Sequence, residues 1–252
     1  MKKVIAFDLD DTLSLSKTQA EDRMVELLNQ LLEKYQVCVI SGGKLEQFQK
    51  QIPFIDATKD GYNLSNLHLM PTCGTRYHRF NRDNEEWEQV YAEDFSESEK
   101  KKIIKALSEG IDETGFRSKK LWGEMIEDRG SQITLSVLGQ EAPVEAKAAW
   151  DPEDVKKYKL REAIAGRLPD FEVRAGGMTS IDVTKQGIDK AYGMKKLMDI
   201  LNITKNEILF MGDKMHEGGN DYPIKIMGID SIAVRDWKDT ALAIETILKL
   251  TS

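Results

Sequence analysis

The sequence has little cysteine, and it has no apolar run of the length that a membrane span needs. Its two cysteines, Cys38 and Cys73, are too few for a disulfide framework and match no zinc-binding spacing, which predicts a reducing, cytoplasmic environment. Apolar runs such as 4–7 and 37–40 are far shorter than the roughly 18 residues of a membrane-spanning helix. Residues 1–3 lead straight into a strand-like stretch, so we expect neither a secretion signal nor a membrane partner.

Positive charge is also in deficit. The chain carries 36 Lys and Arg against 43 Asp and Glu, a formal net charge of −7, which argues against a nucleic acid as partner. A small anionic ligand fits this balance if its site is locally positive. The 252 residues form no internal repeat and suffice for one large domain or two modest ones, at roughly 100 to 200 residues per domain.

Apolar strands followed by helices begin and end the chain. Four segments read as buried strands: 4–9, 37–40, 208–211 and 231–234. The first two are followed by helical spacing of apolar residues over 16–35 and 44–52. This alternation predicts an α/β fold with a parallel sheet that is built from both ends of the chain and carries functional residues after its strand ends.

The middle of the chain has a different pattern. It combines a Lys/Glu-rich helical stretch around 95–107 with a segment of alternating polarity at 132–138. We therefore expect an inserted α+β domain over residues 82–186, with 1–81 and 187–252 forming the core. The two connections would lie close together, as they do in a cap domain that hinges over an active site.

Asp8, Asp10 and Thr12 follow the first predicted strand. Because side chains alternate along a strand, we expect Asp8 and Asp10 to project to the same side, with Thr12 in the loop behind them. Two carboxylates in one small space repel each other unless a divalent cation lies between them, and an oxygen-rich site suits Mg²⁺. Taken alone, the segment also fits an Asp-rich surface turn.

Further polar residues follow the other strands. Asp213 comes directly after a strand and would complete a metal site, whereas Asp221 supplies another oxygen or caps a helix. Ser41 and the backbone amides around Gly42 suit phosphate oxygens at a helix start. Lys190 lies at the beginning of a helix, where the helix dipole disfavours a cation, so a bound anion would explain its placement.

These segments resemble, in their order along the chain, the haloacid dehalogenase (HAD) superfamily of phosphotransferases. The order is Asp-x-Asp-x-Thr, then Ser, then Lys, then Gly-Asp. Residues 212–221, Gly-Asp-Lys-Met-His-Glu-Gly-Gly-Asn-Asp, are similar almost letter for letter to the fourth motif of its subfamily IIB phosphomannomutase and sugar-phosphate phosphatase branch, and residues 176–183 and 187–190 resemble that branch too. The resemblance implies a Rossmann-like core and an inserted α+β cap of the C2 type.

The resemblance also implies catalytic roles. In that family the first aspartate attacks phosphorus, which makes Asp8 the nucleophile that forms an aspartyl-phosphate. Asp10 would be the general acid and base, a role typically worth about 10² to 10⁴ in rate. Ser41 and Lys190 would neutralise the oxygens of the transferred phosphoryl group.

The metal and substrate sites follow from the same resemblance. Mg²⁺ would be held by Asp8, by the backbone carbonyl of Asp10 and by Asp213, with Asp221 supporting the metal shell.

In the insert, Arg129 would clamp the distal phosphate of a sugar phosphate, with Ser180 nearby and Asp182 accepting sugar hydroxyls. We expect Thr12 and Gly42 to contact the substrate as well. An arginine at the position of Arg129 equally fits a surface ion pair.

The chain departs from the branch at several positions. Asp11 replaces a glycine that the branch usually has, and three positions that are arginine in the mutases read Lys17, Gln140 and Lys147. A mutase must keep a bisphosphorylated intermediate bound through strong cationic clamps, whereas a phosphatase need only admit water. The departures therefore favour hydrolysis.

Three functions follow as hypotheses. The first is a cytosolic Mg²⁺-dependent phosphatase that acts on a hexose phosphate. The second is a phosphomannomutase that interconverts mannose 6-phosphate and mannose 1-phosphate. The third, a non-catalytic sugar-phosphate-binding protein, is disfavoured because every catalytic position is present. Mutases of the branch that the chain resembles are often dimers, so a homodimer is an option.

Overall fold

The computed structural model describes residues 1–53 and 63–251. It divides into two compact units: a core unit of Met1–Ala92 and Asp189–Ser252, and an inserted unit of Glu93–Ile188. The sequence pattern places the start of the insert earlier, at residue 82. The difference arises from one β-hairpin, which pairs with the core sheet and so belongs to the core unit.

The core unit contains a seven-stranded sheet within the described part of the chain. Its order is β11-β10-β1-β2-β3-β4-β5. The strands are β1 (Val4–Phe7), β2 (Gln36–Ile40), β3 (Leu67–Met70), β4 (Arg76–Asn81), β5 (Glu86–Ala92), β10 (Ile208–Gly212) and β11 (Asp230–Ala233). The five strands from β11 to β3 are parallel, whereas β4 and β5 add an antiparallel hairpin at one edge. The expected α/β class with a parallel core sheet is therefore confirmed.

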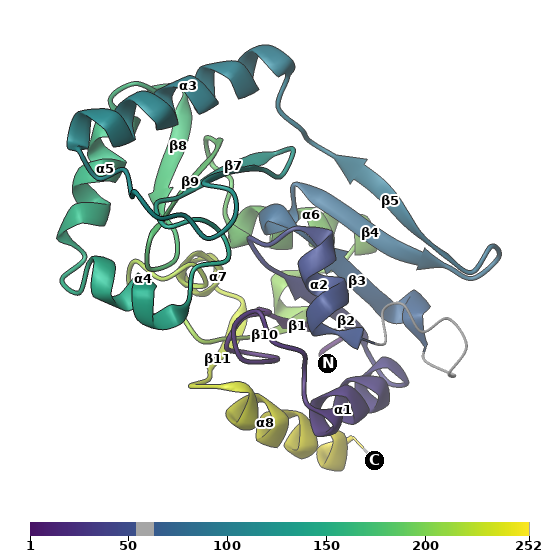
Figure 1. The fold of residues 1–252 in the computed structure, drawn as a ribbon. Coiled ribbons are helices and arrows are strands. Elements are labelled where there is room, and N and C mark those ends of the chain that lie inside the picture. The colour runs from purple at the N-terminus through teal and green to yellow at the C-terminus, as the bar shows by residue number, and fades with distance from the viewer. Residues whose placement is uncertain (54–62, 252) are drawn as a thin grey trace. The chain divides into compact units, whose positions relative to one another are not determined.

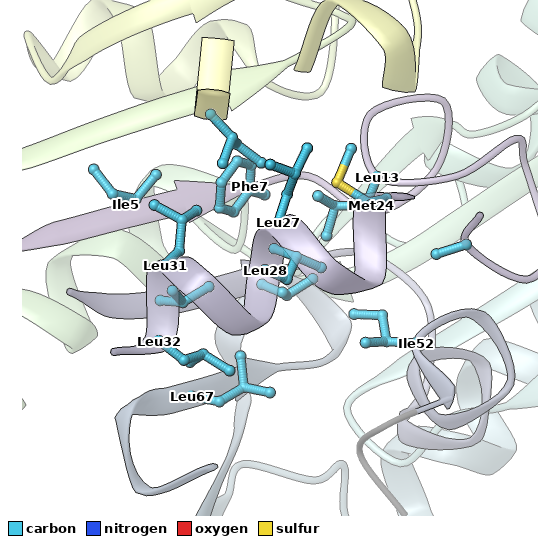
Figure 2. Packing of buried hydrophobic residues seen from close by; sticks show 14 of the residues in the cluster. Ile5, Phe7, Leu13, Met24, Leu27, Leu28, Leu31, Leu32, Ile52 and Leu67 are labelled. Atoms are coloured by element: carbon cyan, nitrogen blue, oxygen red, sulfur yellow. The ribbon is translucent and has the colours of Figure 1, made fainter. Parts of the chain in front are cut away.

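Helices cover both faces of this sheet. The core-unit helices are α1 (Asp22–Leu32), α2 (Leu45–Gln51), α6 (Lys190–Leu201), α7 (Tyr222–Met227) and α8 (Trp237–Leu250), with short 3-10 helices η2 (Leu64–Asn66), η3 (Thr72–Gly74) and η4 (Lys205–Glu207). Buried side chains of α1, α2 and α8 pack in one cluster with β1, and those of α6 and α7 pack in another. Figure 1 shows α1 beside α8, and Figure 2 shows Leu27, Leu28 and Leu31 of α1 beside Ile5 and Phe7 of β1.

The predicted strands and helices of the core lie close to the observed ones. The exception is the predicted helix 16–35, because α1 begins only at Asp22. Lys17 has a left-handed backbone with φ of 60°, which a right-handed helix does not accommodate. The segment before Asp22 therefore forms a loop, and this loop lies against α2 through the hydrogen bond from Ala20 N to Gln51 O.

The inserted unit is an antiparallel sheet covered by helices. Its sheet order is β6-β7-β9-β8. The elements are α3 (Glu97–Thr114), β6 (Ile126–Asp128), β7 (Gln132–Ser136), α4 (Val144–Trp150), α5 (Val155–Ala165), β8 (Phe171–Ala175) and β9 (Ser180–Lys185). Ile133 and Leu135 of β7 and Ile181 and Val183 of β9 pack with α3 and α5. Alternation along the strands then gives the other face its polar residues, as expected for an α+β insert.

None of the described helices is both long enough and apolar enough to cross a bilayer.

Gly193 lets α6 approach η3, and this contact generates a first prediction. A Cβ atom at Gly193 would lie 2.7 Å from the carbonyl oxygen of Cys73 and 2.4 Å from Cδ1 of Ile40. Gly193→Ala should therefore cost about 1 to 3 kcal/mol of unfolding free energy, measured by urea denaturation. Gly166→Ala is the control, because the nearest atom that its Cβ would meet among the described residues is the carbonyl oxygen of Glu162, at 3.6 Å. Equal stability of the two variants would contradict the packing argument.

His68 generates a second prediction, on pH. Its Nδ1 lies 2.7 Å from the Tyr77 hydroxyl and its Nε2 lies 2.7 Å from Gln36 Oε1, so a neutral ring satisfies both neighbours. Burial, and secondarily the charge of Arg79, lower the pKa of His68 to about 4.

The pKa of His68 is lower in the folded protein than its unfolded value of about 6.5. The buried neutral ring therefore contributes stability that is fully present above pH 6.5 and is lost as the pH falls toward 4. Between pH 6.5 and 5 the loss should be roughly 2 kcal/mol. We expect His68→Gln to remove this part of the pH dependence of the unfolding free energy. An unchanged slope would show that His68 does not cause it.

Candidate phosphoryl-transfer site

Three loops of the core unit meet at one edge of its sheet. Asp8 follows β1, Asp213 follows β10 and Ser41 follows β2. Because β1 pairs in parallel with both β10 and β2, the carboxyl ends of the three strands lie side by side. The fold thus places residues that are about 200 positions apart in the sequence at the same edge.

A group of three carboxylates forms there. Asp8, Asp213 and Asp221 each offer an oxygen, and these oxygens lie within 4.8 Å of one another. Asp8 and Asp221 are buried. The approach of Asp221 depends on Gly212, because a Cβ at that position would lie 2.5 Å from Asp221 Oδ2.

Lys190 binds two of these carboxylates. Its Nζ lies 2.5 Å from Asp8 Oδ1 and 2.6 Å from Asp221 Oδ1, and the lysine side chain is fully buried. Burial acts to lower the pKa of Lys190, but the charges of Asp8 and Asp221 outweigh it and raise that pKa. Lys190 therefore stays positively charged at the first residue of α6.

The carboxyl groups of Asp8 and Asp213 respond to the same burial. Burial raises the pKa of Asp8 to about 7, with a further rise from Asp221 and an opposing effect of Lys190. The pKa of Asp213 is raised as well, first by burial. Both raised pKa values mean that burial disfavours the charged carboxylates more than the neighbouring cations stabilise them.

This donor set fits a hard divalent cation. Asp213 Oδ1 is buried and has no hydrogen-bond partner among the residues that the structure describes. Carboxylate oxygens are the ligands that Mg²⁺ prefers, and a cation would satisfy this oxygen and offset the repulsion. Asp221 is less available as a direct ligand, because its Oδ1 binds Lys190 and its Oδ2 accepts from the backbone N–H of Lys214.

The Asp10 side chain lies outside this carboxylate group. It accepts hydrogen bonds from the side chains of Gln47 and Gln51 and from the backbone N–H of Lys17. Simple strand alternation, which predicts that Asp8 and Asp10 share one space, does not extend this far, because β1 ends at Phe7 and Asp11 has φ of 57°. Asp11 thus takes the left-handed conformation that glycine favours, and its Oδ1 accepts from Ser16 N.

Ser41 and Gly42 lie in the loop between β2 and α2. Ser41 is buried, and its Oγ accepts a hydrogen bond from Gly43 N at 3.2 Å. The Ser41 carbonyl accepts from Cys73 N of η3, which fixes the loop. Thr12 is fully buried, and its Oγ1 has no partner within the described ranges, so this hydroxyl is available for a ligand oxygen.

In the inserted unit, two of the three predicted sugar-binding residues already have protein partners. Arg129 forms an ion pair with Glu127, with both Nε and Nη2 at 2.8 Å from Glu127 Oε2. Asp182 Oδ1 accepts from the Thr134 hydroxyl at 2.7 Å. Ser180 lies two residues before Asp182 on β9 and so shares its face of the sheet.

Gln47 and Gln51 are site residues that the sequence analysis misses. Their spacing of four residues on the helix after the Ser41 loop is the signal that could have identified them. The signal is weak, because two glutamines on a short helix are usually solvent-exposed.

The chain is similar to known proteins over nearly its whole length. A family model described as eukaryotic phosphomannomutase matches residues 24–250. A phosphomannomutase of Encephalitozoon cuniculi is 27% identical over 98% of this chain and 94% of its own length, and that of Spinacia oleracea is 27% identical over 88% and 85%.

Solved structures with the same fold have lower identity. A haloacid dehalogenase-like hydrolase from Bacteroides thetaiotaomicron aligns with a TM-score of 0.63 at 16% identity, over 98% of this chain and all of its own. An IMP-bound IMP-nucleotidase of Plasmodium falciparum aligns with a TM-score of 0.68 at 17% identity, over 98% and 68%. The HAD-like α/β fold with its inserted α+β domain is confirmed, as is the resemblance to the phosphomannomutase-like branch.

The carboxylate group generates a prediction on metal binding. Asp213→Asn should weaken Mg²⁺ binding at least about 10-fold, because changes even in the outer shell of a metal site typically cost that much. The measurement is isothermal titration calorimetry with MgCl₂ alone. Asp199→Asn, at an exposed position of α6, is the matched control. Equal affinity of both variants would remove Asp213 from the metal site.

Proposed function

Because this chain belongs to the eukaryotic phosphomannomutase family, we propose that it transfers phosphoryl groups from sugar phosphates through Asp8, with water as the final acceptor. The observation that carries the proposal is the buried Asp8 carboxylate, bound by Lys190 and adjacent to the open Oδ1 of Asp213. The enzyme is then a hexose-phosphate phosphatase. In this proposal, Arg129, Ser180 and Asp182 determine which hexose phosphate the enzyme prefers.

The reaction has two steps. In the first, an oxygen of Asp8 forms a bond to phosphorus while the bond from phosphorus to the sugar oxygen breaks, and Asp10 gives a proton to that oxygen. In the second, Asp10 takes a proton from water, which attacks phosphorus and releases phosphate from Asp8. Lys190, the Ser41 hydroxyl and the amides around Gly42 neutralise the phosphoryl oxygens in both steps.

The proposed metal is Mg²⁺. Asp8, Asp213 and the backbone carbonyl of Asp10 would hold it, and Asp221 would support this set by fixing Lys190 and the loop at Lys214. A bound Mg²⁺ supplies positive charge to the phosphoryl oxygens. The raised pKa of Asp8 supports this assignment. Burial and the nearby charge of Asp221 both disfavour the carboxylate form of Asp8, and a bound cation would stabilise that form.

The substrate is a small sugar phosphate. Arg129 would exchange its ion pair with Glu127 for the distal phosphate or a sugar hydroxyl, and Asp182 and Ser180 would bind hydroxyls. Thr12 would contact the phosphoryl group through its buried hydroxyl. With a net charge of −7, neither a nucleic acid nor a membrane is a partner in this proposal. The proposed location is the cytosol, and a homodimer is an option for this enzyme.

Phosphomannomutase activity is the second candidate. The names of the relatives from Encephalitozoon and Spinacia favour it. The positions Lys17, Gln140 and Lys147 favour hydrolysis, because lysine and glutamine grip a second phosphate less firmly than the bidentate arginines of the mutases. A sensor without catalysis is disfavoured, because the nucleophile, the lysine and the carboxylates are all in place.

Phosphorus NMR separates the two candidates. With Mg²⁺ and either mannose 6-phosphate, mannose 1-phosphate or glucose 6-phosphate, we expect the inorganic phosphate signal to grow. Interconversion of the mannose phosphates without net phosphate release would establish the mutase instead. Asp8→Asn should reduce turnover at least about 10³-fold, because it removes the nucleophile, and Asp199→Asn should leave turnover unchanged. Full activity of Asp8→Asn would contradict the assigned nucleophile.

A further inference from the structure

Asp10 is held from two directions by hydrogen bonds. Gln47 Nε2 donates to Asp10 Oδ2 at 2.8 Å, and Gln51 Nε2 donates to Asp10 Oδ1 at 3.3 Å. The backbone N–H of Lys17 donates to the same Oδ1 at 2.9 Å. Both oxygens of the carboxyl group are thus engaged, one side by α2 and the other by α2 and the loop that follows β1.

The two glutamines also fix each other. Gln47 Nε2 donates to Gln51 Oε1 at 2.7 Å, and Gln51 Nε2 donates to the Ser14 hydroxyl at 2.8 Å. Each amide NH₂ group therefore has two acceptors, which is its full donor capacity. Gln51 is completely buried, so its rotamer is set by packing as well. The pair is a rigid support rather than a mobile surface contact.

Gly43 makes room for this arrangement. A Cβ at Gly43 would lie 2.3 Å from Gln47 Oε1 and 2.8 Å from its Cδ. The Gln47 amide consequently lies directly over the loop that begins at Ser41 and leads into α2. The support of Asp10 is in this way built onto the same loop that is proposed to bind phosphate.

Glutamine suits a group that must both lose and gain a proton. Its amide donates through nitrogen and accepts through oxygen. Donation from its nitrogen holds the carboxylate form of Asp10. The carboxyl form still presents an unprotonated oxygen to the same donor, so the amide need not rotate. A lysine at position 47 would interact favourably with the carboxylate form alone.

We propose that Gln47 and Gln51 are positioning residues that aim the Asp10 carboxyl group at the leaving oxygen of the substrate. The inference rests on the proposed function, which gives Asp10 the role of proton donor. When the bond from phosphorus to the sugar oxygen breaks as Asp8 binds phosphorus, the proton of Asp10 must reach that oxygen. A misdirected carboxyl group slows this transfer without changing the nucleophile.

The test compares two leaving groups. A sugar oxygen leaves as a basic alkoxide and needs a proton, whereas 4-nitrophenolate is stable without one. For a reaction through a phosphoenzyme, kcat/KM reports the first step alone. Gln47→Met, which keeps the side-chain length, should lower kcat/KM for mannose 6-phosphate about 10- to 100-fold, a large part of the usual contribution of a general acid. For 4-nitrophenyl phosphate the change should stay below about threefold.

Two further variants keep the test decisive. Gln47→Asn shortens the side chain and retains an amide, so it should give the same selective loss if Gln47→Met proves unstable in thermal unfolding. Gln30→Met is the matched control, because the exposed Gln30 amide on α1 donates to Glu26, one turn earlier on the same helix. It should leave both substrates unaffected.

Equal losses with both substrates, or no loss with either, would overturn the positioning role while leaving the proposed function intact. If the wild-type protein turns over neither substrate with Mg²⁺, the proposed function itself fails, and this inference fails with it.

Discussion

The site depends on a single buried cation, the ammonium group of Lys190. It lies within 2.6 Å of both Asp8 and Asp221, and all three side chains are buried. Two carboxylates in such a position would repel each other strongly, and removal of one partner from a buried ion pair typically costs 3 to 5 kcal/mol. The positive charge of Lys190 makes a charged Asp8 compatible with folding. The same positive charge would attract the negative oxygens of a phosphoryl group bound beside Asp8.

The fold brings these groups together through strand order. Because β1 lies between β10 and β2, loops from the two ends of the chain meet beside Asp8. Close packing then fixes the details: Gly212 admits Asp221, Gly193 admits the start of α6 to η3, and Gly43 admits the Gln47 amide. At each of these positions a side chain would displace a group on which the site depends.

Much of this arrangement could be predicted from the sequence, because apolar strands that end in Asp8, Ser41 and Asp213 lead to one sheet edge by the geometry of parallel sheets alone. The hairpin of β4 and β5 could not, since strand β5 is mostly exposed and carries little apolar signal, and its attachment to the core depends on pairing with β4 and on the packing of Trp87 and Tyr91. The direction of the Asp10 side chain could not either. It depends on the left-handed backbone of Asp11 and on two glutamines 37 and 41 residues away, and neither follows from local alternation.

The site of covalent phosphorylation tests most directly whether Asp8 is the nucleophile. The protein is mixed with mannose 6-phosphate and Mg²⁺, quenched in acid within the first turnovers, digested and analysed by mass spectrometry. We expect phosphate on the peptide that contains Asp8, and on that residue within it. A phosphate carried by another residue, or continued turnover without any phosphorylated peptide, would contradict this assignment.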